Sequence, residues 1–342
     1  MGRTEIQSTY GENKEVEISV VLPCFNEEKH IISSLKTVAS QLSFVTDSFE
    51  IIVVDDGSRD ETWELLSLGV VDLPYLRCFK LSRNFGKEFA LCAGLEQAQG
   101  KAVIVMDSDM QHPPFLIPEI IEKWRNSNAE IIECRKRFRG NESLIKKTGS
   151  GLFYTIINKL TGFELKNATD FKLIDRKVVE AWRKMPEKQT FFRGMTAWLG
   201  FKKIIIEFDT AERIEGESKW SLIDLLKLGT NAVVSFSSLP LRIVTIFGGI
   251  FFLFSIILGA QTLYYKIFDK SVTGFTTTIL LLLIIGSLIL LSLGIIGEYI
   301  AAIYNEVKER PRYVLSDVIE KDTMNNMKGH PSKEENNTFV TH

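Results

Sequence analysis

Short apolar runs recur along the first part of the chain, and stretches with helical spacing separate them. The runs rich in β-branched residues cover positions 17–23, 50–56, 76–82, 102–107 and 129–134. Between them, apolar residues recur every three to four positions, as in Glu27–Leu42 and Lys87–Gln99. Continuous apolar strands that alternate with helices are typical of a mostly parallel sheet covered on both faces. The pattern therefore predicts an α/β fold whose ligands bind beyond the carboxyl ends of the strands.

A different pattern begins near position 239, where charged residues become rare. The segments 243–265 and 276–304 each exceed the roughly 20 apolar residues that cross a bilayer. The connection 266–275 is too short to form a domain, so we expect a transmembrane hairpin with both flanks on one side of the membrane. The preceding segment has Trp220 and Ile223 near one face, which predicts an amphipathic interface helix, although a helix facing the core would show the same spacing.

These patterns predict the order of domains. We expect a flexible tail over 1–16, an α/β domain over 17–218, an interface helix region over 219–240, two transmembrane helices over 241–304 and a cytosolic tail over 305–342. Arg242 before the first span and the basic residues after the second favour a cytosolic α/β domain, although Lys266 and Lys270 in the loop weaken this bias.

Composition narrows the class of protein. The formal net charge of −2 over 342 residues argues against a bulk nucleic-acid-binding role, which usually requires a basic excess. The four cysteines lie far apart without a CxxC pair, so they suggest neither a zinc site nor a disulfide framework and fit a reducing cytosol. The first residues lack the apolar segment of a signal peptide.

Polar residues gather where the predicted strands end. The first strand runs into "PCFNEE", the second into "DDGSRDET", the fourth into "DSDMQ" and the fifth into "CRKRFRG". Taken alone, "DDGS" is also an ordinary turn and helix cap. Because the carboxyl ends of parallel strands meet at one edge of a sheet, these groups together predict a binding site there.

Asp107 and Asp109 stand two positions apart at a strand end, where alternation can point both carboxylates the same way. Together with the amide oxygen of Gln111 they suit Mg²⁺ or Mn²⁺, ions that take few protein carboxylates and leave places for ligand phosphates. The stretch does not match an EF-hand, because His112 and Pro118 replace the turn glycine and the final glutamate. It predicts a site for a metal-bound diphosphate.

A set of motifs in a fixed order carries a family resemblance. The set comprises "PCFNEE", "VDDGSRDET", "LSRNFGKEFALCAG", "MDSDMQHPP", "NATDFKLIDR", "FRGMTAW" and "GESKWSL". Over residues 17–315 the chain resembles the polyisoprenyl-phosphate glycosyltransferases of glycosyltransferase family 2, among them the bactoprenol glucosyltransferases and, more distantly, dolichyl-phosphate mannose synthase. An ordered set is far more specific than any one motif.

The resemblance implies a GT-A fold and an inner-membrane enzyme that uses Mg²⁺ or Mn²⁺. Its partners would be a UDP-sugar donor, with UDP-glucose expected first, an undecaprenyl phosphate acceptor, the lipid bilayer and further copies of the chain, with a tetramer as one possibility. The product would be a lipid-linked sugar for modification of cell-surface glycans such as lipopolysaccharide. Gly248, Gly249 and Gly286 would permit close contacts between helices.

Residue roles follow from the same resemblance. The donor nucleotide, its sugar and the metal would contact Pro23, Phe25, Asn26, Glu27, Asp56, Lys87, Asp107, Ser108 and Asp109. Phosphate groups of donor and lipid acceptor would contact Arg135, Arg193 and Lys219, whereas we expect Arg137 and Arg139 to be surface charges. Thr169 departs from the pattern, because many relatives have glycine before the next aspartate, and this could alter the backbone there.

Asp170 is the catalytic candidate with the most open role. The resemblance implies a general base, and burial beside Phe171 could raise its pKa. An acceptor phosphate with a second pKa of about 6 arrives largely ionised, which favours an orienting role instead. A helix cap is the third reading.

Two other functions stay open on sequence grounds. A processive polysaccharide synthase is disfavoured because "QTFFRG" lacks the QxxRW spacing and two spans are few for a polymer channel. A membrane scaffold or flippase subunit that only binds nucleotide or lipid is disfavoured because it has no need of several metal and phosphate ligands at one edge.

Overall fold

The computed structural model describes residues 15–110, 112–137, 168–185, 187, 191–209, 239–268, 274–308 and 310–320. The described residues up to Asp209, together with Pro311–Glu320, belong to one compact unit, and those from Leu239 to Arg310 belong to a second. We call the first the α/β unit and the second the two-helix unit. Most of the predicted interface helix region and most of the predicted N-terminal tail lie outside the described residues, while 239–240 begin the first apolar helix.

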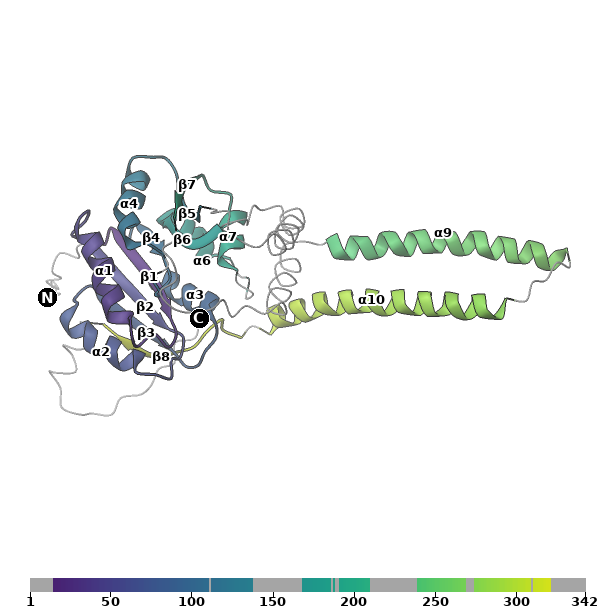
Figure 1. The fold of residues 1–342 in the computed structure, drawn as a ribbon, viewed down its shortest axis with the longest axis horizontal. Coiled ribbons are helices and arrows are strands. Elements are labelled where there is room, and N and C mark those ends of the chain that lie inside the picture. Colours follow the sequence, from purple (N-terminus) through teal and green to yellow (C-terminus); the bar gives the residue numbers. More distant parts are fainter. Residues whose placement is uncertain are drawn as a thin grey trace, which may run out of the picture. The chain divides into compact units, whose positions relative to one another are not determined.

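The described part of the α/β unit contains one sheet with the strand order β7-β5-β6-β4-β1-β2-β3-β8 (Figure 1). Its strands are β1 (Ile18–Cys24), β2 (Phe49–Asp55), β3 (Leu76–Leu81), β4 (Ala102–Val105), β5 (Ile131–Lys136), β6 (Ala168–Asp175), β7 (Lys203–Phe208) and β8 (Leu315–Ile319). The pairs β1–β2, β1–β4, β2–β3 and β5–β7 are parallel. The sheet confirms the predicted mostly parallel α/β class.

Antiparallel strands modify this plan. β6 lies between β4 and β5 and is antiparallel to both, so the predicted fifth strand does not pair with the fourth. β8 is antiparallel to β3 at the edge of the sheet. β6 was not predicted from the sequence, because Asp170 and Lys172 interrupt its apolar run.

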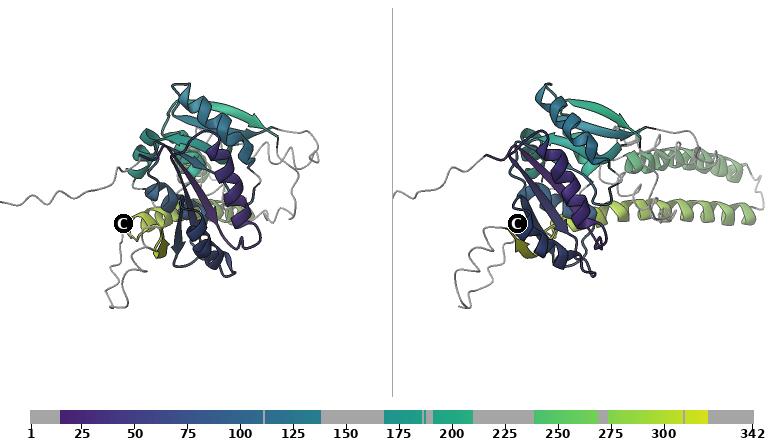
Figure 2. Two further views of the ribbon diagram at one scale, coloured as in Figure 1. Left: turned by 90° about the vertical axis from the view of Figure 1, so that its left-hand side faces the viewer. Right: turned by 60° about the vertical axis from the view of Figure 1, so that its left-hand side comes forward.

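Helices cover both faces of the sheet (Figure 2). One face carries α1 (Ile31–Ser43), α2 (Thr62–Asp72), the 3₁₀ turn η1 (Pro114–Leu116) and α4 (Ile117–Arg125), which contact one another through α1. The other face carries α3 (Lys87–Gln97), α6 (Arg176–Arg183) and α7 (Phe192–Trp198). Each strand in the middle of the sheet is therefore buried on two sides, which explains why these strands have continuous apolar runs.

Strand alternation decides which side chain meets which helix layer. In β1, Val20 and Leu22 join the core with Leu35 of α1. Val21 points the opposite way, toward α3, where a Cβ at Gly94 would lie 2.3 Å from Val21 Cγ1. Glycine at position 94 thus allows α3 to pack closely on the sheet.

The same alternation in β6 separates its apolar from its polar residues. Phe171 and Leu173 belong to the core on the α1 side. Asp170 and Lys172 point the other way, toward α3 and α7, with which they form the contacts described below. β6 therefore presents two buried charges to one helix layer.

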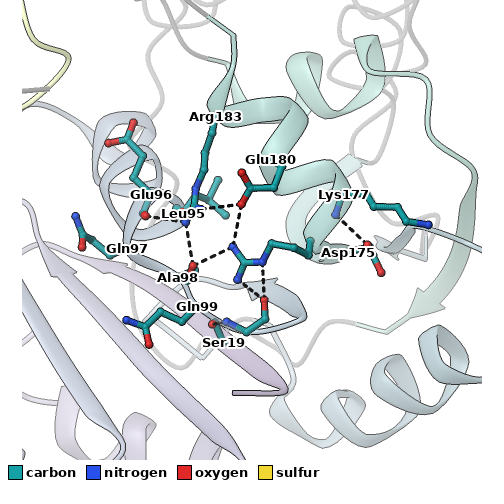
Figure 3. Close-up of polar contacts among 12 residues, drawn as sticks. Ser19, Leu95, Glu96, Gln97, Ala98, Gln99, Asp175, Lys177, Glu180 and Arg183 are labelled. Carbon is teal, nitrogen blue, oxygen red and sulfur yellow. Dashed lines mark hydrogen bonds and ion pairs between the residues drawn. The ribbon is translucent and has the colours of Figure 1, made fainter. Parts of the chain in front are cut away.

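Arginine side chains join α6 to the end of α3 (Figure 3). Arg183 Nη2 donates to the carbonyl oxygens of Leu95, Glu96 and Ala98 at 2.9, 2.7 and 2.9 Å. The last carbonyls of a helix have no partner within the helix, and a cation there also interacts favourably with the helix dipole. Arg183 thus satisfies the C-terminal end of α3 and fixes α6 on it.

The predicted C-terminal tail over 305–342 needs correction, because part of it belongs to the sheet. Residues 315–319 form β8, and Arg77 bridges Glu50 in β2 and Glu320 beyond β8, both at 2.7 Å. Tyr313 donates from its hydroxyl to Glu96. This strand was not predicted from the sequence, because five residues without strong alternation give no clear periodic signal.

The two-helix unit contains α9 (Leu239–Ile267) and α10 (Phe275–Val307). Both helices are long and apolar enough to cross a membrane, judged by length and composition. Their apolar side chains are largely exposed, as expected for helices that would face lipid. The predicted spans 243–265 and 276–304 lie within these two helices.

We expect Arg312→Ala to destabilise the α/β unit. Arg312 Nη2 donates to the carbonyl oxygens of Met185 and Glu187 at 2.5 and 2.6 Å, and its side chain is 13% exposed. Loss of these bonds leaves carbonyls without their donor, at a cost of about 1–3 kcal/mol. The midpoint of thermal unfolding, followed by tryptophan fluorescence, should fall. Ser316→Ala on β8, which loses one exposed 3.3 Å bond, is the control and should leave the midpoint nearly unchanged.

Candidate active site

A cavity of about 410 Å³ opens at the carboxyl ends of β1, β2 and β4. Its walls come from Pro23, Cys24, Phe25, Glu27, Asp56, Asn84, Gly86, Lys87, Asp107, Ser108 and Asp109. The structure thus brings together nearly all of the residues predicted to contact the donor. Asn26 is the exception, and Cys24, Asn84 and Gly86 are additional.

Asn26 holds two loops together instead of lining the cavity. Its backbone has a φ of 55°, a left-handed conformation that asparagine tolerates better than most residues. The side-chain oxygen of Asn26 accepts a hydrogen bond from the backbone N–H of Arg59 at 2.9 Å. The backbone N–H of Asn26 donates to Ser58 Oγ, also at 2.9 Å. The loops after β1 and β2 are therefore fixed to each other at the mouth of the site.

Asp56 organises the loop before α3. Its two carboxylate oxygens accept from the backbone N–H groups of Phe85 and Gly86 at 2.7 and 2.9 Å. Burial nevertheless raises the pKa of Asp56 above its usual value. Gly57 has a φ of 69°, and a Cβ there would lie 2.5 Å from the carbonyl carbon of Arg83, so only glycine lets these loops approach.

Three carboxylates face the cavity and fit a divalent cation. Asp107 and Asp109 both line it, as does Glu27. Burial, and then the charge of Asp109, raise the pKa of Glu27. Mg²⁺ and Mn²⁺ need one or two such carboxylates beside ligand phosphates and water. No cluster of three histidine, cysteine or acidic ligands is preformed within the described residues, and Gln111 lies outside them.

His112 holds the backbone of Asp107 in place through a hydrogen bond. Burial lowers the pKa of His112, which keeps the imidazole neutral at pH 7. Nδ1 can therefore accept a hydrogen bond from the backbone N–H of Asp107, at 3.0 Å. The ring stacks on Phe171 with centroids 5.2 Å apart, so the core itself positions the end of β4.

Lys87, the first residue of α3, connects the cavity to a buried carboxylate. Its Nζ lies 2.5 Å from Asp107 Oδ1 and 2.7 Å from Asp170 Oδ2. Burial alone would lower the pKa of Lys87, but the charges of Asp170 and Asp107 outweigh it and raise the pKa. The ammonium group therefore stays charged.

Asp170 is paired with a second cation, Arg193 of α7. Arg193 Nε and Nη2 donate to the two carboxylate oxygens at 2.7 and 2.8 Å, a bidentate geometry. Burial alone would raise the pKa of Asp170, but the hydrogen bonds and charges of Arg193 and Lys87 hold it well below its usual range. Asp170 is thus an ionised carboxylate and a weak proton acceptor, and the pKa rise expected from burial is wrong.

Thr169 does not distort the backbone next to Asp170. It lies within β6, and Asn26 and Met110 are the only non-glycine residues with positive φ in the described part of the chain. The Thr169 hydroxyl donates to the carbonyl oxygen of Cys134 in β5. A side chain at this position therefore fits the sheet.

The remaining basic residues are two predicted phosphate ligands, Arg135 and Lys219, and two predicted surface charges, Arg137 and Arg139. Arg135 lies on β5, where its Nε donates to Glu133 at 2.8 Å. Arg137 is 57% exposed in its side chain, in line with a surface charge. Lys219 and Arg139 lie outside the described residues.

Glu88 and Lys172, which both contact α7, were not predicted from the sequence. Glu88 accepts from the backbone N–H of Phe192, and Lys172 donates to Thr196. The sequence signal for these two residues was their position next to predicted site residues. Glu88 follows Lys87 in "GKEF", and Lys172 stands two places after Asp170, on the same face of the strand.

Comparison with known proteins identifies two family models on the chain. The model described as glycosyl transferase family 2 matches residues 19–183. The model described as the GtrB C-terminal hairpin matches residues 239–303, which contain most of α9 and α10. The first match contains the whole cavity, and the second contains the two-helix unit's apolar segments.

A solved structure of glucosyl-3-phosphoglycerate synthase from Mycobacterium tuberculosis, in complex with Mn²⁺, UDP-glucose and phosphoglyceric acid, is a distant match. It has 17% identity and a TM-score of 0.42, and the alignment covers 64% of this chain and 78% of that one. A score this low adds nothing to the family assignment.

Curated relatives match nearly the whole chain. An uncharacterized glycosyltransferase of Synechocystis sp. is 38% identical over 89% of this chain and 96% of its own length. The prophage bactoprenol glucosyl transferase homolog of Escherichia coli is 36% identical over 89% and 99%. The bactoprenol glucosyl transferase of Shigella phage SfV is 35% identical over 90% and 100%. The chain therefore belongs to glycosyl transferase family 2, as a glycosyltransferase with a GT-A-like α/β fold and a GtrB-type C-terminal hairpin.

Proposed function

We propose that this protein transfers glucose from UDP-glucose to undecaprenyl phosphate, with inversion at the anomeric carbon and with Mg²⁺ or Mn²⁺ bound. The observation that carries the proposal is the chain of ion pairs from Asp107 through Lys87 to Asp170 and Arg193, with Asp109 beside it in the cavity wall. It combines a metal-type carboxylate pair with two cations suited to phosphate. The names of the bactoprenol glucosyl transferase relatives support the lipid and the sugar.

The donor would occupy the cavity. Phe25, 40% exposed, offers a ring to the base, while Asp56 keeps the loop beside it in place. Asp107, Asp109 and Gln111 would hold the cation, which supplies charge neutralisation for the departing diphosphate. Lys87 adds a fixed positive charge at the same edge, where negative charge develops in the transition state.

The acceptor phosphate would approach Arg193. The side chain of Arg193 is 37% exposed, and its bonds to Asp170 use two of the five N–H donors of a guanidinium. The phosphate provides its own nucleophilic oxygen, and with a second pKa of about 6 it is largely ionised at pH 7. Asp170, already ionised and paired twice, therefore acts by orienting Lys87 and Arg193, with no proton to remove.

The membrane proposal rests on connectivity as well as on apolarity. The chain leaves the α/β unit before α9 and returns to its sheet as β8. Two crossings bring both ends to the same side, so α9 and α10 form a hairpin in the cytoplasmic membrane. Arg242 at its start and Lys308 at its end favour the cytosolic side for the α/β unit.

A homo-oligomer, with a tetramer as the first candidate, is part of the proposal. A Cβ at Gly248, Gly249 or Gly286 would meet nothing within 4 Å in one chain. These small residues remain open to helices of other copies.

A direct assay tests the function. The full chain in detergent, with UDP-glucose, Mg²⁺ and a polyprenyl phosphate, should release UDP and produce a glucosylated lipid extractable into organic solvent. Release should require the lipid. A protein that binds UDP and lipid but releases no UDP with any common nucleotide sugar would be a scaffold instead.

We expect Asp109→Asn to abolish transfer while largely preserving nucleotide binding. The change removes a carboxylate from the cation site but leaves Phe25 and Asp56 intact. The dissociation constant for UDP without metal, measured by calorimetry, should stay within about twofold of the wild-type value. The Mn²⁺ concentration needed for any remaining turnover should rise by more than the 10–100-fold that is typical when a residue hydrogen-bonded to a metal ligand is lost. Unchanged turnover and metal dependence would remove Asp109 from the cation site.

We expect Asp170→Asn to lower turnover most at low pH and to recover in part as pH rises. Without the carboxylate, Lys87 and Arg193 lose their fixed positions, but an acceptor that is fully ionised above its second pKa of about 6 binds cations more strongly. A pH profile from 5.5 to 9 compares the variant with the wild type. A loss that stays equally deep at high pH would identify Asp170 as a general base.

A further inference from the structure

Helix α7 is short, and its first turn carries Arg193. The helix has seven residues, and its N-cap residue, Phe191, makes no side-chain capping bond. A helix of this length has little stability of its own, because nucleation is costly and few hydrogen bonds follow. Its position must therefore be set by contacts with the rest of the α/β unit.

Glu88 on α3 supplies one such contact. Its Oε2 accepts from the backbone N–H of Phe192 at 2.7 Å, one of the first N–H groups of α7, which have no partner within the helix. Glu88 is partly buried, and this burial, followed by the charge of Asp170, raises its pKa to about 7. A carboxylate in such a place makes a specific bond at an electrostatic cost.

Lys172 on β6 supplies a second contact. Its side chain is fully buried, and Nζ donates to Thr196 Oγ1 at 3.1 Å and lies 5.2 Å from the centroid of the Phe192 ring. The Thr196 hydroxyl in turn donates to the carbonyl oxygen of Phe192 at 2.8 Å. Burial lowers the pKa of Lys172 to about 8 despite the nearby charge of Glu133. A lysine buried in this way is expensive to keep, which favours a role beyond packing.

We propose that Glu88 and Lys172 are positioning residues that hold the first turn of α7 between α3 and β6 and so fix the Arg193 guanidinium for the acceptor phosphate. The proposal rests on the acceptor role of Arg193 given above. Arg193 is anchored at its side chain by Asp170, and these two residues anchor its backbone. Both ends of the side chain are then fixed, which reduces the ordering cost when phosphate binds.

The test measures binding to the full chain in detergent, without turnover. The probes are farnesyl phosphate, for the acceptor site, and UDP, for the cavity. Glu88→Ala and Lys172→Met should each weaken farnesyl phosphate binding by about three- to tenfold, the worth of one hydrogen bond. UDP binding should stay within about twofold. Glu88→Gln, whose amide oxygen can still accept from Phe192, should bind farnesyl phosphate nearly as the wild type does.

A double-mutant cycle separates positioning from general stability. If Glu88 acts through Arg193, Glu88→Ala should have little further effect on farnesyl phosphate binding in an Arg193→Ala background. Glu96→Ala is the matched control, because Glu96 lies on the same helix and accepts a bond from Tyr313 at the opposite end. It should lower the thermal midpoint but leave both affinities unchanged, whereas Lys172→Met should not lower the midpoint.

Three outcomes with the variants would overturn the proposal. They are unchanged farnesyl phosphate affinity in Glu88→Ala and Lys172→Met, equal losses for both probes, and additive losses in the Arg193→Ala background. A wild type that binds neither farnesyl phosphate nor inorganic phosphate would also overturn it. A wild type that binds farnesyl phosphate as described but transfers no sugar would support the positioning role and contradict the proposed function alone.

Discussion

The burial of the Asp170 carboxylate is the constraint on which the site depends. Moving an unpaired carboxylate out of water costs several kcal/mol or more, so Asp170 requires partners that are both charged and well oriented. Lys87 and Arg193 meet this requirement from two different helices, at 2.7 to 2.8 Å. One buried charge on β6 therefore determines where the first residue of α3 and the first turn of α7 must lie.

The same pairing prepares the site for phosphates. Lys87 is shared between Asp170 and Asp107, so the charge balance of the cavity is linked to that of the Arg193 region. Cations held by a fixed carboxylate need little rearrangement when an anion arrives, which is how preorganised electrostatic sites act. On the cavity side, Glu27, Asp107 and Asp109 line the same space, and burial together with the charge of Asp109 raises the pKa of Glu27.

The sheet also explains how the C-terminal hairpin can belong to this fold without ending it. β8 returns after α10 and pairs with β3, and Arg77 and Arg312 bind it to the rest of the α/β unit. In sequence the hairpin is therefore an insertion into the α/β unit. The last described strand before the insertion, β7, and the strand after it, β8, belong to the same sheet.

The sequence by itself determined the α/β class, the cavity residues after β1, β2 and β4, and the two apolar helices, because periodicity and strand-end motifs are local signals. It did not determine that β6 separates β4 from β5 or that 315–319 joins the sheet. It also did not determine that Asn26 connects the loops after β1 and β2 by hydrogen bonds instead of lining the cavity. Nor could it decide the charge state of Asp170, whose partners are 83 and 23 residues away. Those features depend on strand register and on contacts between distant segments, and a pKa follows from the balance of burial and charge that only the tertiary structure decides.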